Sequence, residues 1–248
     1  AVIIDGRITE EAWQGVPAAS DFRQQDPCEG EPATQRTEVR ILYDDEALYI
    51  PPRLFDHGEV RTRLGRRDEQ PEGDNILFVL DTFHDHTGRT MFWLNPSGVK
   101  YGAGQASSFV DPSWDPIWDA ATQIDSLGWS AEMRIPLSQL RYQSADIQSW
   151  GMQVWRFIER LNEVSMWSFW GKNAPGGPPF FGHVDELRLP ARNLGVEVMP
   201  YLVARAERIT PPQPGNPVVN AAANSARVGG DVKAILGSSL TIDAAINP

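Results

Sequence analysis

Apolar and polar side chains alternate along most of the first 190 residues, and turn-forming residues separate the alternating runs. Asp-Gly, His-Gly, Pro-Ser-Gly, Leu-Gly and Pro-Gly-Gly-Pro-Pro sequences stand between the runs, and such clusters favour turns. An alternation with a period of two is typical of strands that bury one face. The pattern predicts strands over residues 37–43, 47–55, 75–82, 89–95, 98–102, 129–135, 151–160, 165–170 and 183–189. Because no long apolar stripe follows the helical period, we expect an all-β fold, an antiparallel β-sandwich of jelly-roll type.

The alternation also assigns side chains to the two faces of each strand. In the strands expected at 75–82, 89–95, 129–135 and 151–160, one face is mainly aliphatic, whereas the other mixes aromatic with polar side chains. A mixed face is typical of a ligand groove, because rings can stack on a ligand while polar groups hydrogen-bond to it. The residues that we predict to bind a ligand are Trp93, Asn95, Glu132, Arg134 and Trp155.

Each of these residues also has a structural interpretation. The Trp rings would then pack beneath loops as a second, smaller core. Glu132 and Arg134 would belong to a charge-paired network with Arg156, Glu159 and Arg160. Four further Trp residues in or near turns either line a site or hold long loops in place; they are Trp114, Trp118, Trp167 and Trp170.

The pattern changes after Pro190. Three long, weakly hydrophobic strands are expected there, at residues 194–208, 225–236 and 239–246, with a Pro- and Asn-rich connection at 211–224 and a Gly237-Ser238 hairpin turn. Three strands cannot bury a core or cover their own edges. We therefore expect one domain over residues 1–190, and we expect residues 191–248 to belong to a larger β structure within which the chain has been cut.

The composition excludes several other classes of function. The formal net charge is −11 and the basic residues form no stripe, so we expect no nucleic-acid partner, because a phosphate backbone would be repelled. The single cysteine, Cys28, cannot form an internal disulfide. No run of about 18 apolar residues predicts a transmembrane helix.

No motif indicates an enzyme. The sequences G-x-S-x-G and H-E-x-x-H, a P-loop and a dinucleotide fingerprint are absent, and a carboxylate beside arginines has a lowered pKa that does not suit a glycosidase acid. We therefore predict a non-catalytic protein with no cofactor other than a structural calcium ion. Asp81 and Asp85, in an acidic loop that matches no complete calcium-loop spacing, offer hard oxygen ligands for that ion.

Several separated blocks of sequence carry a resemblance to a known family. The first is Ile4-Asp5-Gly6-Arg7-Ile8-Thr9-Glu10-Glu11-Ala12-Trp13, and the others are residues 37–56, 74–82, 92–99, 128–140, 150–156 and 181–189. Together they resemble carbohydrate-binding module family 9, a β-sandwich. Further segments resemble one branch, bacterial outer-membrane proteins in which such a domain precedes a β-barrel. These segments are Arg66-Arg67-Asp68, residues 94–99, residues 114–119, residues 135–142 and residues 240–248.

The resemblance implies a ligand class and a location. Sugar-binding members clamp a terminal sugar between two Trp rings; the matching positions here are Pro71 and the segment 172–175, and Asn95 is retained as a groove amide. The implied role is a carbohydrate-recognition or accessory domain of an outer-membrane β-barrel, with residues 191–248 as the truncated start of that barrel. Its partners would be a carbohydrate and the rest of the barrel, on the periplasmic side of a Gram-negative cell envelope. The alternative is a structural plug or gating module that binds no sugar.

Overall fold

The computed structural model describes residues 2–66, 69–106, 109–111, 114, 116–143, 145–190, 195–208, 222–236 and 240–246. The chain divides into two compact units, Ala1–Pro190 and Ala191–Pro248, which are described separately below. Residues 211–221 of the connection expected at 211–224 lie outside the described residues, and so does the expected turn Gly237-Ser238. Arg67, Asp68 and Asp115, which carry part of the family resemblance, also lie outside them.

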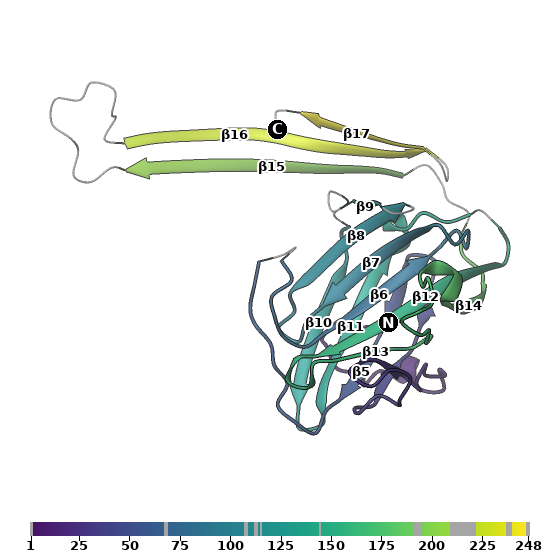
Figure 1. Ribbon diagram of the computed structural model, residues 1–248. Coiled ribbons are helices and arrows are strands. Elements are labelled where there is room, and N and C mark those ends of the chain that lie inside the picture. Colours follow the sequence, from purple (N-terminus) through teal and green to yellow (C-terminus); the bar gives the residue numbers. More distant parts are fainter. Residues whose placement is uncertain are drawn as a thin grey trace. The chain divides into compact units, whose positions relative to one another are not determined.

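Two antiparallel sheets make up the first unit (Figure 1). The eight-stranded sheet runs in the order β1 (Arg23–Asp26), β13 (Glu163–Met166), β12 (Gln148–Ile158), β6 (Asn75–Asp81), β7 (Gly88–Leu94), β8 (Lys100–Ala106) and β9 (Phe109–Asp111), and β14 (Gly182–Leu187) also pairs with β12. The six-stranded sheet runs in the order β2 (Thr37–Val39), β5 (Pro52–Phe55), β11 (Gly128–Pro136), β4 (Ala47–Ile50) and β3 (Leu42–Tyr43), and β10 (Asp119–Asp125) also pairs with β11. Short 3-10 turns occur at η1 (Glu11–Trp13), η2 (Leu137–Gln139), η3 (Glu159–Leu161) and η4 (Pro178–Phe180).

The core lies between the two sheets and contains the aliphatic faces that the alternation predicts. Ile76, Phe78 and Leu80 of β6 are fully buried there, and β11 contributes Met133 and Ile135 from the other sheet. The predicted all-β class and antiparallel sandwich are thus confirmed. Strands β1, β9 and β10 were not expected. The sequences of β1 (RQQD) and β10 (DAATQID) are too polar for an apolar alternation to show.

A buried arginine joins the two sheets. Arg156 projects from β12 into the interior, where its Nη1 donates to the carbonyl of Arg36 (3.0 Å) and to Oγ1 of Thr37 (3.1 Å). Its Nη2 donates to the carbonyl of Phe55 (2.8 Å) and lies 3.4 Å from Oδ2 of Asp56. Burial lowers the pKa of Arg156 to about 10, and nearby carboxylates oppose that shift.

The charge-paired network therefore does not include Glu132, although the sequence predicted it there. Arg156 and Arg160 both pair with the buried carboxylate of Asp56, whereas Glu132 lies on β11 of the other sheet, away from the interior. The period of two places residues on a face of a strand, but it does not say to which sheet the strand belongs.

The second unit is a three-stranded antiparallel sheet of β15 (Gly195–Arg208), β16 (Ala222–Leu236) and β17 (Leu240–Ile246), close to the three expected strands. Its register separates two faces. The described side chains of one face are Val198, Pro200, Leu202, Ala204, Ala206, Asn224, Ala226, Val228, Gly230, Val232, Ile242, Ala244 and Ile246. This face is apolar except for Asn224, while the opposite face carries Arg205, Arg227 and Asp231. No helix within the described residues is long and apolar enough to cross a membrane.

Candidate functional site

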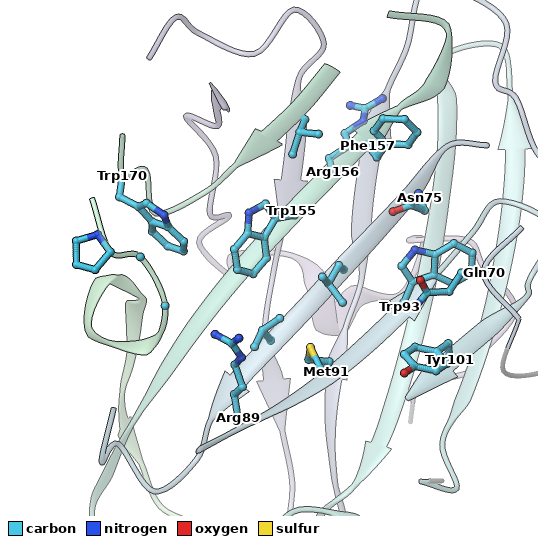
Figure 2. Close-up of a pocket in the computed structure, with 16 residues that line it drawn as sticks. Gln70, Asn75, Arg89, Met91, Trp93, Tyr101, Trp155, Arg156, Phe157 and Trp170 are labelled. Atoms are coloured by element: carbon cyan, nitrogen blue, oxygen red, sulfur yellow. The ribbon is translucent and has the colours of Figure 1, made fainter. Parts of the chain in front are cut away.

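A groove with a volume of about 760 Å³ lies on the outer face of the eight-stranded sheet (Figure 2). Its floor comes from the strand positions that alternate with the core positions of β6, β7 and β12. The residues that line it are Gln70, Asn75, Leu77, Val79, Arg89, Met91, Trp93, Tyr101, Trp155, Arg156, Phe157, Val164, Trp170, Pro175, Gly176 and Gly177.

The two predicted Trp residues stand in one row across this floor. Leu77 of β6 is paired with Trp93 of β7 on one side and with Trp155 of β12 on the other, and Trp93 is paired in turn with Tyr101 of β8. Because neighbouring strands lie about 4.8 Å apart, the backbones at Trp93 and Trp155 are about 10 Å apart. Trp93 is only 5% exposed, whereas Trp155 is partly exposed. Trp155 is therefore the ring that a ligand can reach.

One wall of the groove is an aromatic loop that follows β13. The Trp155 ring meets the Trp170 ring edge-on, with 5.6 Å between centroids, and the Phe181 ring at 6.2 Å. Gly176 has a positive φ of 66°, and a Cβ there would lie 2.7 Å from Nε1 of Trp170. The loop thus needs glycine at this position to pass so close to the indole.

The polar groups of the groove lie toward its two ends. Figure 2 shows the Arg89 guanidinium directed toward Trp155, with Gln70 and Asn75 at the Trp93 end. Burial lowers the pKa of Arg89 from its usual value. Arg156 also borders the groove, but its guanidinium is used between the sheets. The sixteen described lining residues include no Asp or Glu.

The structure brings Trp93 and Trp155 together, but it places Asn95 elsewhere. Strand β7 ends at Leu94, and Asn95 is fully buried in the turn that follows. Its Oδ1 accepts from the backbone N of Ser97 (3.0 Å) and Val99 (2.9 Å), and its Nδ2 donates to the carbonyl of Arg63 (2.9 Å). The amide is therefore occupied in fixing a turn.

Glu132 also lies outside the groove, on the outer face of the six-stranded sheet beneath the N-terminal segment. Its carboxylate accepts from the backbone N of Asp5 (3.0 Å) and Gly6 (3.1 Å) and from Nε1 of Trp13 (3.2 Å). Burial raises the pKa of Glu132 to about 6, and the neighbouring carboxylate of Glu10 adds to the rise, while the N–H donors oppose it. Glu132 thus holds the N-terminal segment on the sandwich.

Arg134 belongs to the same face as Glu132. Its Nη2 lies 3.2 Å from Oε2 of Glu46, and a hydrogen bond with Tyr49 raises its pKa. The predicted platform of five residues therefore does not assemble, because β11 faces outward from one sheet and β7 and β12 from the other.

The residues predicted for calcium are engaged by their own loop. Oδ2 of Asp81 accepts from the backbone N of His86 (3.0 Å), and Oδ1 of Asp85 accepts from the backbone N of Thr87 (2.9 Å) and Gly88 (3.1 Å). Burial raises the pKa of Asp85, but these backbone hydrogen bonds outweigh it and lower the pKa below its usual value. Among the residues described here, no three His, Cys, Asp or Glu side chains are grouped as a metal site. Calcium binding stays a prediction, which a calcium titration would test.

Sequence patterns did not single out Arg89, Tyr101 or the loop at 175–177 as parts of the site. Arg89 and Tyr101 have the correct strand parity, so a wider search of the same faces could have found them. Trp170 was noted only as a loop aromatic that either lines a site or holds a loop; it lines the groove. Trp118, by contrast, is 2% exposed and part of the core.

A second hollow of about 510 Å³ lies at the six-stranded sheet. Arg53 and Asp125 border it and form an ion pair with 2.7 Å between Nη2 and Oδ1. None of the described residues that line this hollow is aromatic, so the outer groove of the eight-stranded sheet is the better candidate site.

Solved structures with a similar fold include carbohydrate-binding modules. A family 9 carbohydrate-binding module from Caldicellulosiruptor kristjanssonii in complex with cellotriose is 17% identical, with a TM-score of 0.55 over 78% of this chain and 91% of that chain. The glucose complex of such a module from the same organism is 16% identical, with a TM-score of 0.55 over 78% of this chain and 93% of that chain. A candidate carbohydrate-binding protein from Bacteroides uniformis is 17% identical, with a TM-score of 0.56 over 70% of this chain and 88% of that chain.

These likenesses define the fold as that of a family 9 carbohydrate-binding module. No protein-family model matches the sequence. No curated protein matches it either.

Proposed function

We propose that residues 1–190 form a non-catalytic carbohydrate-recognition domain that holds its ligand in the groove of the eight-stranded sheet. The observation that carries this proposal is the partly exposed Trp155 ring, set in an aromatic row on the sheet face of a fold shared with modules solved in complex with cellotriose and glucose. The two-Trp clamp of the sugar-binding family members is not what supports it, because the matching positions in this chain hold no Trp.

The chemistry of the groove suits a sugar ring. The axial C–H groups of a pyranose form an apolar face that stacks on an indole, while its hydroxyls need fixed donors and acceptors. Trp155 offers the face, and Gln70 and Asn75 offer amides at the opposite end. Trp170 and the glycine loop close one side, so that a bound ring would be shielded from water on its edge as well as its face.

A glycan array probed with the full chain and with Trp155→Ala tests this proposal. The wild-type chain should bind a set of glycans, and Trp155→Ala should lose roughly five- to a hundredfold in affinity, if the face of a sugar gains as much on an indole as a nucleobase does on an aromatic ring, roughly 1–3 kcal/mol. The matched control is Tyr43→Ala, which removes a partly exposed aromatic ring from the other sheet and should bind like the wild type.

Two results would overturn the carbohydrate proposal. One is an array on which the folded wild-type chain binds nothing above background. The other is equal binding by Trp155→Ala and the wild type, after thermal melts show that both are folded. Either result would favour a structural plug or gating module instead.

We further propose that residues 191–248 begin a transmembrane β-barrel, which would place the sandwich on the periplasmic side of an outer membrane. The support is the division of the three-stranded sheet into one apolar face and one face with charges, since barrel strands alternate between lipid and a polar interior. Strand β15 has 14 residues, more than the roughly 9–11 needed to span a bilayer.

Cysteine labelling in the cell envelope tests the barrel proposal. In a Cys28→Ser background, Leu202→Cys on the apolar face should be protected from a water-soluble maleimide, whereas Arg205→Cys on the opposite face should be labelled. Equal labelling of the two sites, or recovery of the protein outside the membrane fraction, would refute it.

A further inference from the structure

We propose that the groove selects an anionic saccharide and that Arg89 binds its acidic group. This inference rests on the proposed function, because it assumes that the groove binds a carbohydrate. It adds the chemical class of the sugar, a ring that carries a carboxylate or a sulfate ester.

The first argument is the position of Arg89. It lies on β7 two residues before Met91 and four before Trp93, with the same strand parity, so its side chain leaves the sheet on the groove side. Figure 2 shows its guanidinium directed toward Trp155. The group also lies close to the loop wall, because a Cβ added at Gly177 would be 3.7 Å from Nη1. A ligand stacked on Trp155 would therefore present one edge to a guanidinium.

The second argument is the charge of the groove. The chain carries 33 acidic and 22 basic residues, yet the described lining residues include no Asp or Glu. A site for neutral hydroxyls needs strong acceptors as well as donors, and carboxylates are the strongest acceptors that side chains supply. Among the described lining residues, the acceptors are limited to amide and hydroxyl oxygens, whereas the one charged group directed into the groove, the Arg89 guanidinium, is a donor.

The third argument is the burial of Arg89. The side chain is partly buried, and burial lowers its pKa, so its charge is less screened by water than that of a surface arginine. A guanidinium has five N–H donors in a planar fork, so it can serve a ligand beside its contacts within the protein. A carboxylate or sulfate matches that fork with two parallel hydrogen bonds. A charge-assisted pair at this site would discriminate an acidic sugar from its neutral analogue.

Calorimetry with matched sugars tests the inference. The probes are trigalacturonate, its methyl ester, cellotriose and 6-O-sulfated cellotriose, each titrated into the full chain. Trigalacturonate should bind roughly ten- to a hundredfold more tightly than its methyl ester, because a hydrogen bond to a charged partner contributes about 1.5–3 kcal/mol. Arg89→Gln should remove this difference and keep the weaker binding of the ester. Arg134→Gln, which removes an arginine from the other sheet, should behave like the wild type.

Each outcome separates the inference from the proposed function. An Arg89-dependent preference for the sulfated rather than the carboxylated sugar supports the inference and assigns the acidic group. Equal binding of acid and ester, with loss in Trp155→Ala, overturns the inference but keeps the carbohydrate site. A preference for the acid that persists in Arg89→Gln also overturns it. If no probe binds to the folded wild-type chain, both proposals fail.

Discussion

Replacing Arg156 by Met should lower the free energy of unfolding by roughly 3–5 kcal/mol, the cost of breaking a buried ion pair from one side. Arg156 is 1% exposed, and the side chain of its partner Asp56 is fully buried. Met keeps most of the aliphatic volume of the arginine stem, so the substitution removes the charge and the hydrogen bonds without opening a large cavity.

The magnitude follows from what the substitution leaves behind. The carbonyls of Arg36 and Phe55 and the hydroxyl of Thr37 lose a charged donor, and each such bond is worth about 1.5–3 kcal/mol. The cost of removing the guanidinium from water offsets part of this hydrogen-bond energy, and its Nε has no hydrogen-bond partner in the described chain. Asp56 keeps its contact with Arg160, which limits the loss.

Urea denaturation of the full chain, followed by Trp fluorescence, measures the effect. The matched control is Arg63→Met, which breaks an exposed pair with Glu72 (3.2 Å) and should cost at most about 1 kcal/mol. If Arg156→Met is as stable as Arg63→Met, then the arginine does not join the two sheets energetically, and the reasoning from buried charge is wrong.

Three further predictions concern the scaffold around the site. Because burial raises the pKa of Glu132 to about 6, the folded state binds that proton more tightly than the unfolded chain; the unfolding free energy should therefore fall as the pH rises from about 4.5 to 6, by at most about 2 kcal/mol. Urea titrations at several pH values should show this fall in the wild type but not in Glu132→Gln. The same dependence of the unfolding free energy on pH in both proteins would contradict the prediction. Gly6→Ala should cost roughly 1–3 kcal/mol more than Gly15→Ala, since both glycines have a positive φ but only at Gly6 would the Cβ meet backbone, at 2.6 Å; equal melting temperatures would refute this. Asn95→Ala should destabilise by about 2–3 kcal/mol by losing three hydrogen bonds, whereas Asn75→Ala, which loses one, should cost about 1 kcal/mol or less in the same assay.

The sequence was sufficient for the strands with a clear apolar alternation and for the side of each that faces the core, but not for β1, β9 and β10. Ile76, Phe78 and Leu80 alternate with Leu77 and Val79 in the sequence, and the structure places the first set in the core between the sheets and the second along the groove. This succeeds because a period of two is a local property of an extended backbone.

The alternation with a period of two could not show which residues form the groove. Trp93 and Glu132 both point away from the core, but they do so from opposite sheets. Which strands pair is decided by contacts between distant segments, such as β11 with β4 and β5, and parity carries no information about them. Asn95 was misplaced for a different reason. Strand β7 ends at Leu94, and in the turn that follows the side chains no longer alternate between the two faces of a sheet. The loop that brings Trp170 to the groove has no periodicity at all.

Because groove and core side chains alternate along the same strands, different residues determine which ligand binds and how the two sheets pack. Along β6, β7 and β12, each groove side chain is the chain neighbour of a core side chain, yet the two are divided by the thickness of one sheet. Replacing Leu77, Met91 or Phe157 by another residue with good strand propensity would change the shape and polarity of the groove. The packing between the two sheets would stay the same. In such a scaffold the groove residues can change by small steps while the packing between the sheets stays the same, and solved structures with a similar fold are only 16–17% identical to this chain.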